Sequence, residues 1–482
     1  MAGGLEIVER EEGGRAHSSE PEGVQLGASA RLARFAAKVF LPAGYPASVS
    51  PVTGTERTED YLRYQIFNAL QAFCSALAGL ISSRAILEGF GVGNANASAT
   101  HALLLTVLQD SFSRLTTIAA AYLVGPLLSP EAKSFRLLAD LANDAALLLD
   151  ALSPRLAPTP ALRTTALCLS GALRALCGVA AGGAKAALAL HFASPPGSTG
   201  DVGDLNAKDG SKETVLALLG MLAGSLLVPH LTTPHTTLFV LLLLLSLHLL
   251  LNYAGLRGVV LRTLNRQRLA LAWGLHRTGA PHTPARVAAL ERLLARPSAL
   301  YDPYTHRAVG RCTLGSSLRA VLRGEGAAPL PAGLLGAMRA ERYVLWFDRA
   351  SLSFSPPPTP PAPATAPAPA QEAQAQLRPG AVHLHICLRE GYTPADLLKA
   401  WVHAAEVALL LQQQQQRIDK GAAEVVLAAY RRLERVFPGF VEGLRGAGWD
   451  TTGVALLAGA PRTVIVSIGG KDLPDYEARK DV

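Results

Sequence analysis

Charged side chains recur at a regular interval in an apolar stretch around residues 161–193. Arg163, Arg174 and Lys185 stand eleven residues apart. Eleven residues is close to a whole number of helical turns, so a helix would place them on one face at intervals of about 16 Å. Charges in an apolar helix must be paired, hydrated or near an interface. This basic ladder therefore indicates either a polar cavity for an anionic solute or ion pairs that fix helix packing.

Carboxylates elsewhere in the sequence could neutralise the basic ladder. Asp110, Asp140 and Asp144 are the expected partners, with Asp140 or Asp144 facing Arg174. The complete predicted intramembrane polar or anion site comprises Asp110, Arg114, Asp140, Asn143, Asp144, Arg163, Arg174 and Lys185. A motif loop with Lys208 and Asp209 precedes the next apolar run and could line a cavity mouth. Alternatively, Asp209 or Ser211 caps the following helix.

Three further patterns carry weaker chemical signals. His383, His385 and Cys387 alternate on one strand face, but a metal site usually needs further converging ligands, so a simple strand face is the favoured interpretation. The glycine-rich segment 89–94 follows an apolar helix and is better explained as a turn than as a dinucleotide loop. Asn96-Ala97-Ser98 fits the glycosylation sequon. The sequence contains no catalytic triad, carboxylate pair or zinc spacing, and predicts no enzyme, cofactor or metal.

The composition favours a membrane protein with soluble parts. The chain has 482 residues and a net charge of +8, with 49% hydrophobic but only 17% charged residues, against roughly 25% charged in soluble proteins. Five scattered cysteines exclude a disulfide scaffold. The basic residues do not gather with aromatics, which argues against nucleic acid as a partner.

The most apolar run predicts a helical hairpin in the membrane. Residues 214–256 contain no Asp, Glu, Lys or Arg, and one helix of that length would be about twice the thickness of the bilayer core. Pro229 and Pro234 divide the run near its middle, so we expect spans near 214–231 and 236–256. Basic residues flank both outer ends, which places them, and the C-terminal half, on the cytosolic side.

Weaker spans precede the hairpin. Residues 64–83 are uncharged, with small and polar residues on one face that should meet other helices. Two further spans, at about 101–124 and 161–193, contain charges. Residues 131–152 form an amphipathic stretch that lies either at the membrane interface or inside the bundle.

The expected architecture is mainly α: a polytopic helical transmembrane bundle followed by a small cytosol-facing α+β domain. In the second half, strands are predicted at 342–347, 352–354, 381–388 and 462–468, the first two joined as a hairpin, with helices at 393–416 and 421–436.

The N-terminus resembles neither a signal nor a transit peptide. The expected domains are a disordered acidic tail (1–39), the helical membrane domain (40–260), a basic amphipathic helical connector (261–300) and the α+β domain (301–482), interrupted by a Pro/Ala-rich linker (355–380).

Five ordered motifs resemble the root UV-B sensitive (RUS) family, chiefly over residues 40–300. They are Phe40-Leu41-Pro42-x-Gly44-Tyr45-Pro46-x-Ser48-Val49, Asp60-Tyr61-x-x-Tyr64-Gln65, Gly91-Val92-Gly93-Asn94-Ala95, Arg136-Leu137-x-Ala139-Asp140-x-x-Asn143-Asp144 and Ala207-Lys208-Asp209-x-Ser211-x-Glu213-Thr214. The chain departs from the family at an insertion near 52–59, and at 109–110 and 113–114, where the family has Lys-Asp and Gly-Arg.

The resemblance implies a membrane protein with no catalytic residues to carry over. Plant members act in seedling root development under UV-B and are linked to vitamin B6 balance and auxin transport. We therefore expect a multi-pass integral membrane protein that acts through protein partners or a small ligand, with the lipid bilayer and another RUS-family protein as partners. A transporter of a small anionic solute is the first alternative, and a membrane-bound enzyme is the second. The ligand and the organelle stay open.

We predict that the full chain remains in the membrane pellet after alkaline carbonate extraction and dissolves only in detergent. The reason is the charge-free run 214–256, whose length and central prolines suit two membrane crossings. Immunoblotting of pellet and supernatant is the measurement, and recovery in the carbonate supernatant would contradict the prediction.

Overall fold

The chain is mostly helical, with a small sheet in its C-terminal part, and divides into two compact units, Met1–Val260 and Leu261–Val482. The computed structural model describes residues 60–92, 98–156, 158–194, 200–322, 330–348, 351–354, 375–377, 382–413, 421–452, 456–457, 459–461 and 463–466, with short segments between 8 and 57. The sequon residues Asn96 and Ala97, the linker except 375–377, and part of the predicted strand 462–468 lie outside the described residues.

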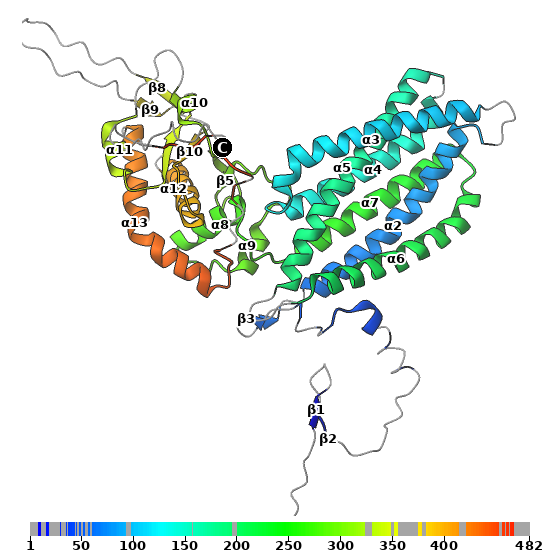
Figure 1. Cartoon of the computed structure of the whole chain (residues 1–482), viewed down its shortest axis with the longest axis horizontal. Coiled ribbons are helices and arrows are strands. Elements are labelled where there is room, and N and C mark those ends of the chain that lie inside the picture. The colour runs from blue at the N-terminus through cyan, green and yellow to red at the C-terminus, as the bar shows by residue number, and fades with distance from the viewer. Residues whose placement is uncertain are drawn as a thin grey trace, which may run out of the picture. The chain divides into compact units, whose positions relative to one another are not determined.

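The first unit is a bundle of long helices that run side by side (Figure 1). Its helices are α2 (Asp60–Gly89), α3 (Ala99–Leu128), α4 (Ala132–Leu152), η1 (Ser153–Leu156), α5 (Pro160–Ala193), α6 (Val202–Leu227), η2 (Val228–His230) and α7 (Pro234–Gly258). Helix α2 packs against α4, α6 and α7, while α5 packs against α3 and α4. Short strand pairs β1 (Val8–Arg10) with β2 (Ala16–Ser18) and β3 (Val52–Thr53) with β4 (Glu56–Arg57) precede the bundle.

The predicted hairpin is present as α6, η2 and α7. Thr233 caps α7 by accepting a hydrogen bond from the Thr236 N–H at 3.2 Å, and Pro234 occupies the first turn, where its missing N–H is not needed. Helix α6 begins earlier than predicted, because Asp201 caps it through the N–H groups of Gly203 and Asp204. Capping by Asp209 or Ser211 was therefore wrong, and the predicted motif loop with Lys208 lies inside α6.

Four described helices are long and apolar enough to cross a membrane. They are α2, α5, α6 continued through η2, and α7. The predicted span at 101–124 lies in α3, which is not among them; a polar run from Gln109 to Thr117 interrupts its apolar sequence. The amphipathic stretch 131–152 is α4, which packs inside the bundle rather than at its surface, with Asp140, Asp144 and Asp150 buried.

The second unit contains a four-stranded sheet in the order β5-β6-β10-β7. Its elements are α8 (Arg266–Arg277), α9 (Pro284–Leu290), β5 (Ala299–Tyr301), β6 (Ala308–Leu314), α10 (Leu318–Leu322), α11 (Ala332–Ala337), β7 (Tyr343–Phe347), β8 (Leu352–Phe354), β9 (Ala375–Leu377), β10 (His383–Leu388), α12 (Pro394–Gln413) and α13 (Ala422–Gly446). Strand β10 pairs parallel with β6 and antiparallel with β7. Helix α12 packs on this sheet and against α8 and α13.

Several local predictions for this unit are confirmed. Strands β7, β8 and β10 and helix α12 lie where expected. Thr393 caps α12, because its hydroxyl accepts from the Asp396 N–H at 3.3 Å while the Asp396 carboxylate accepts from the Thr393 N–H at 2.8 Å. This reciprocal pair satisfies two N–H groups that a helix start leaves open.

Two other predictions for this unit are wrong, one about strand pairing and one about where a helix ends. Strands β7 and β8 do not form a hairpin: β7 pairs with β10, and β8 pairs with β9. Helix α13 continues past Pro438 to Gly446, because Phe440 and Leu444 beyond the proline are fully buried and their packing outweighs the loss of one backbone hydrogen bond.

The predicted connector 261–300 is part of the second unit rather than one amphipathic helix. Helix α7 ends at Gly258, residues 259–265 are not helical, and α8 begins at Arg266. Trp273 and Leu269 of α8 are buried in the core of this unit. The arginine Arg268 is buried too, and its Nε donates to the Glu291 carboxylate at 2.7 Å, which removes the exposed charge that an interfacial helix would present.

Candidate functional site: a buried polar network and a cationic pocket in the helical bundle

A buried carboxylate, Asp140, lies at the centre of the polar contacts in the bundle. Its Oδ1 accepts from Arg136 Nη1 on the same helix at 2.5 Å, and its Oδ2 accepts from Asn252 of α7 at 2.5 Å. Gln71 of α2 also donates to Oδ2. Three helices therefore meet at one carboxylate, and its hydrogen bonds offset the loss of water.

His248 of α7 extends this network to a second carboxylate. Its Nε2 lies 3.1 Å from the amide nitrogen of Gln71, and its Nδ1 lies 2.9 Å from Asp144. Because an amide nitrogen only donates, Nε2 accepts and Nδ1 carries the proton toward Asp144. Asp140, Gln71, His248 and Asp144 thus form a continuous chain of hydrogen bonds between α2, α4 and α7.

A second group of contacts links α2 to α5 and α6. Asn68 accepts from Arg136 at 3.3 Å and donates to Glu213 at 2.7 Å. Glu213 also binds Lys185 Nζ at 2.8 and 2.9 Å. The polar groups of the bundle consequently form a connected network across α2, α4, α5 and α6.

Asp209 is held in the same region by α2. The hydroxyl of Tyr61 donates to its carboxylate at 2.8 Å and the amide of Gln65 donates at 2.6 Å, while Lys212 Nζ lies 2.8 Å away. This close approach of α2 and α6 requires a small residue, because a Cβ on Gly220 would lie 2.5 Å from the Phe73 carbonyl oxygen. Glycine at this position therefore lets the two backbones approach.

Two of the three cations of the basic ladder pair with carboxylates, but not with the predicted ones. Arg174 pairs with Asp150 of α4 rather than with Asp140 or Asp144, and Lys185 pairs with Glu213. Arg163 donates to the backbone carbonyl of Gly89. The partner assignment for Arg174 was wrong because Asp140 and Asp144 bind side chains of α2 and α7. Asp150 lies almost three helical turns beyond Asp140 and under two beyond Asp144 on α4.

The other predicted site residues are divided between the network and the surface. Asn143 donates to its neighbour Asp144 at 3.4 Å. Asp110 and Arg114 form an exposed pair on α3, 3.6 Å apart, with Arg114 80% exposed, so they do not join the buried groups. Lys208 donates to the backbone carbonyl of Lys38 at 2.5 Å, which ties α6 to the chain before α2.

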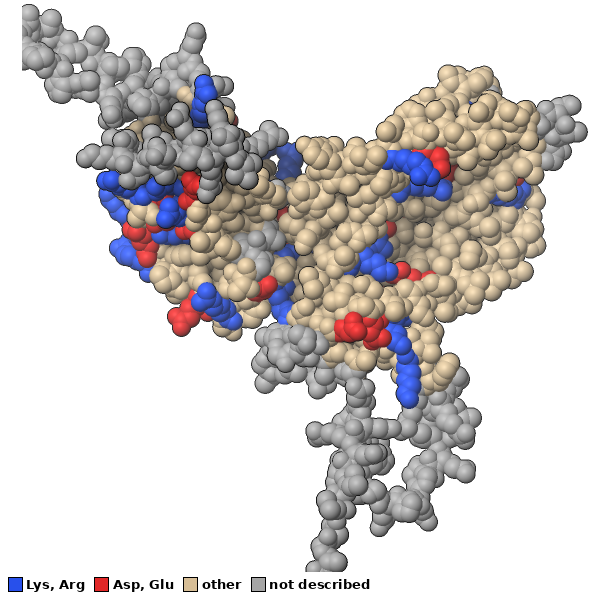
Figure 2. All heavy atoms as spheres, in the orientation of Figure 1, with Lys and Arg blue, Asp and Glu red and all other residues tan. Residues whose placement is uncertain are grey.

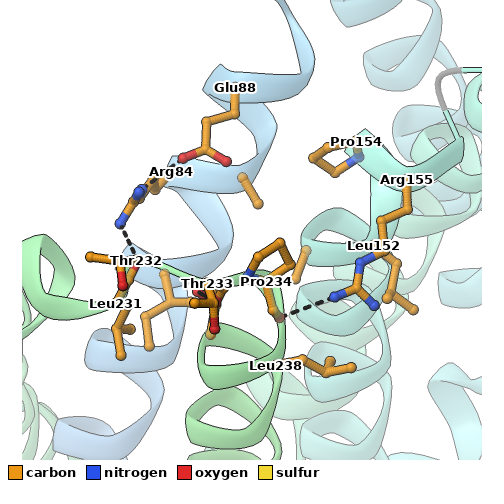
Figure 3. Close-up of a pocket in the computed structure, with 14 residues that line it drawn as sticks. Arg84, Glu88, Leu152, Pro154, Arg155, Leu231, Thr232, Thr233, Pro234 and Leu238 are labelled. Atoms are coloured by element: carbon orange, nitrogen blue, oxygen red, sulfur yellow. Dashed lines mark hydrogen bonds and ion pairs between the residues drawn. The ribbon is translucent and has the colours of Figure 1, made fainter.

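A pocket of about 300 Å³ lies between the end of α2, η1 and the turn from η2 to α7. Figure 3 shows the guanidinium groups of Arg84 and Arg155 at its wall, with Thr232 and Thr233 between them. Arg84 binds Glu88 at 2.7 Å and the carbonyls of Val228 and Leu231, and Arg155 binds the Pro234 carbonyl at 3.0 Å. An arginine has five N–H donors, so both guanidinium groups retain donors beyond these bonds.

The strand residues His383, His385 and Cys387 lie in the second unit, on β10. The two imidazole rings lie side by side, with centroids 4.6 Å apart and planes tilted by 35°. Cys387 is buried, and burial raises the pKa of its thiol to about 12, so it is protonated at neutral pH. A thiol must lose its proton to bind a metal well, so Cys387 is poorly suited as the third ligand.

Sequence reasoning missed several members of the network. Asp150, Glu213, His248 and Asn252 were not among the predicted site residues, although each is a polar residue within an apolar helix. His248 interrupts the most leucine-rich run of the chain. An ionisable residue at such a position is itself a signal that partners lie on neighbouring helices.

We predict that Arg174→Ala lowers the free energy of unfolding of the detergent-solubilised chain by about 2 kcal/mol, because the fully buried Asp150 loses a cationic partner that is itself 43% exposed. Adding Asp150→Asn should restore part of this loss, so the double variant should lose less than the sum of the single variants. Arg114→Ala is the matched control, whose exposed pair should change stability by less than about 1 kcal/mol. Additive single effects would show that Arg174 and Asp150 do not interact.

Two parts of the chain match known families. Residues 27–276 match the family described as "Vitamin B6 photo-protection and homoeostasis domain". Residues 375–459 match the family described as "Root UVB sensitive protein, C-terminal". No solved structure matches the chain.

Three named relatives support these matches. The chain is 34% identical to RUS family member 1 of Dictyostelium discoideum, over 53% of this chain and 47% of that protein. It is 26% identical to root UVB sensitive 3 of Arabidopsis thaliana, over 86% of this chain and 82% of the relative. It is 30% identical to the Arabidopsis root UVB sensitive 2, chloroplastic, over 48% of this chain and 50% of the relative. The match thus spans about half the length of two of these relatives and most of the third. Because residues 27–276 make up just over half of the chain, we conclude that this chain belongs to the root UVB sensitive family.

Proposed function

We propose that this chain is a multi-pass integral membrane protein that serves vitamin B6 homeostasis without a catalytic step of its own. It acts by binding a small anionic ligand in the pocket beside Arg84 and Arg155. Its partners are the lipid bilayer and another RUS-family protein, and nucleic acid is not among them. The description of the matching family, which names vitamin B6, is the reason for choosing this class of ligand.

Apolar surface supports the membrane part of the proposal. Large hydrophobic side chains point outward along α3, α6 and α7, for example Ile118, Leu226 and Phe239, which are 69%, 75% and 69% exposed. Figure 2 shows few charged groups over the visible face of the helical unit. Exposed apolar area on this scale is unfavourable in water and suits contact with lipid tails. The proposal puts the turn of the hairpin on the side away from the cytosol, and the basic residues at the outer ends of the hairpin support this orientation.

The pocket beside the hairpin turn is the observation that carries the ligand proposal. The lining contains two arginines, Arg84 and Arg155, and one carboxylate, Glu88, which pairs with Arg84, so the wall carries a net positive charge. Guanidinium groups bind phosphate through paired, charge-assisted hydrogen bonds. Leu152, Pro154 and Leu238 supply apolar wall, against which an aromatic ring can pack. A volume of about 300 Å³ lies at the lower end of the range for small-molecule sites.

A phosphorylated B6 vitamer matches this wall chemically, because it joins a flat pyridine ring to a phosphate dianion. In this proposal Arg84 and Arg155 bind the phosphate, and the threonine hydroxyls at the turn supply further donors. The buried network around Asp140 then has a structural role: it holds α2, α4 and α7 in register, and these helices form the pocket at their ends.

Transport of the same anion is the second candidate function. The chain of hydrogen bonds from Asp140 through Gln71 and His248 to Asp144 favours it, because titratable groups linked through a bundle are typical of proton relays in transporters. In that case the ladder residues serve helix packing, since Arg174 and Lys185 are already paired.

The experiment is calorimetric titration of the detergent-solubilised full chain with pyridoxine 5′-phosphate, which has no aldehyde to react with surface lysines. We expect saturable binding, and much weaker binding of pyridoxine, which lacks the phosphate. Arg84→Gln combined with Arg155→Gln should raise the Kd at least about tenfold, because two charge-assisted hydrogen-bonding groups are lost.

The matched control is Arg114→Gln, which changes an exposed arginine on α3, a helix that contributes no lining residue to the pocket, and it should leave the Kd unchanged. Binding that is absent, or equally strong in the double variant and the wild type, would contradict the pocket. Uptake of the ligand into proteoliposomes separates the two candidates: a binding protein shows no uptake, whereas a transporter shows uptake that Asp140→Asn abolishes.

A further inference from the structure

Three potential metal ligands converge at one edge of the sheet in the second unit, far from the residues of the bundle in sequence. They are His383 and His385 on β10 and Asp348, the residue that follows β7. One ligand atom from each lies within 4.8 Å of the other two. All three side chains are part-exposed, with 33%, 17% and 36% of their surface accessible, so ions can reach them from solution.

The register of the sheet explains why these residues meet. His383 and His385 are two positions apart on one strand and therefore point to the same face. Strand β7 runs antiparallel beside β10, with Phe347 opposite Leu384, and the Asp348 N–H donates to the His383 carbonyl at 2.7 Å. The end of β7 thus brings a carboxylate beside the histidine pair.

The nitrogen atoms of both rings are oriented for a shared ligand. His383 Nε2 lies 2.9 Å from the Thr313 hydroxyl and His385 Nδ1 lies 2.8 Å from the Ser316 hydroxyl. The opposite nitrogens, His383 Nδ1 and His385 Nε2, face Asp348 at 3.4 and 4.0 Å. Metal-binding histidines typically have the second nitrogen fixed by such an outer hydrogen bond.

The separations between these atoms lie within reach of those around a tetrahedral ion. Ligands bound at 2.0–2.1 Å in a tetrahedron lie about 3.3 Å apart. His383 Nδ1 lies 3.4 Å from Asp348 Oδ2, close to this value, whereas His385 Nε2 lies 4.0 Å from the other carboxylate oxygen, Oδ1. One ligand atom of each residue lies within 4.8 Å of the other two, so small side-chain rotations can bring all three to these separations. Two imidazoles and one carboxylate are a ligand set for Zn²⁺ that leaves a fourth position open for water.

We propose that Asp348, His383 and His385 form a Zn²⁺ site on the second unit, with Thr313 and Ser316 as positioning residues that hold the two rings. The site joins β7, β10 and the end of β6, so bound metal ties together three of the four strands. It is independent of the proposed vitamin B6 function, because it uses no residue of the helical bundle.

The test uses the full chain, purified in detergent without a polyhistidine tag and stripped of metal with a chelator. Zn²⁺ titration in competition with a chromogenic chelator should give one site per chain that is lost in His383→Gln and in His385→Gln. Asp348→Asn, which keeps the size of the side chain, should raise the Kd at least about tenfold, and Ser316→Ala should raise it by about tenfold because the ring is less well oriented. His101→Gln, which removes an exposed histidine on α3, is the control and should change nothing.

Co²⁺ provides a second readout that does not depend on activity. The wild-type chain should show the visible absorption of tetrahedral Co²⁺, and Asp348→Asn should weaken or shift it. Circular dichroism checks that each variant is folded, and folding is expected because all three ligands are partly exposed. A wild-type chain that binds no Zn²⁺, or a His383→Gln/His385→Gln double variant that binds it as tightly as the wild type, would overturn the proposal.

Discussion

The arrangement of the helical unit depends on the burial of Asp140. A carboxylate withdrawn from water is destabilising unless hydrogen bonds and a counter-charge replace its hydration. These partners come from Gln71 on α2, Arg136 on α4 and Asn252 on α7. Because each partner is on a fixed turn of its helix, satisfying this one group sets the depth and rotation of three helices. In a bilayer such polar contacts select the helix arrangement more strongly than apolar contacts do. The reason is that apolar side chains gain little free energy when they exchange contact with lipid for contact with one another.

The same constraint accounts for the remaining polar groups of the bundle. The ion pair of Lys185 and Glu213 joins α5 to α6, and the ion pair of Arg174 and Asp150 joins α5 to α4. Pairing removes these cations from any ligand site, whereas Arg84 and Arg155 at the hairpin end bind mainly backbone carbonyls and keep donors for a ligand. The ends of the helices, rather than their middles, therefore suit the binding of an anion.

The sequence predicts features that depend on local composition and fails where partners are far apart along the chain. The hairpin could be predicted because the charge-free run 214–256 and its prolines act locally. The pairing of Arg174 with Asp150 could not, because the choice among carboxylates depends on which faces of α4 are taken by α2 and α7. Likewise, His383 and His385 are visible as an alternating pair, but Asp348 joins them only through strand pairing.

The most direct test of whether the helical unit spans a bilayer is to measure which side of the membrane each end of the α6–α7 hairpin faces. Single cysteines placed at Ala207 and Thr232, both exposed in the structure, would be introduced into a chain with its native cysteines replaced by alanine. A membrane-impermeant maleimide is then applied to sealed vesicles of either orientation. The account predicts that the two positions react from opposite sides, with Ala207→Cys on the cytosolic side. Labelling of both positions from the same side would contradict it.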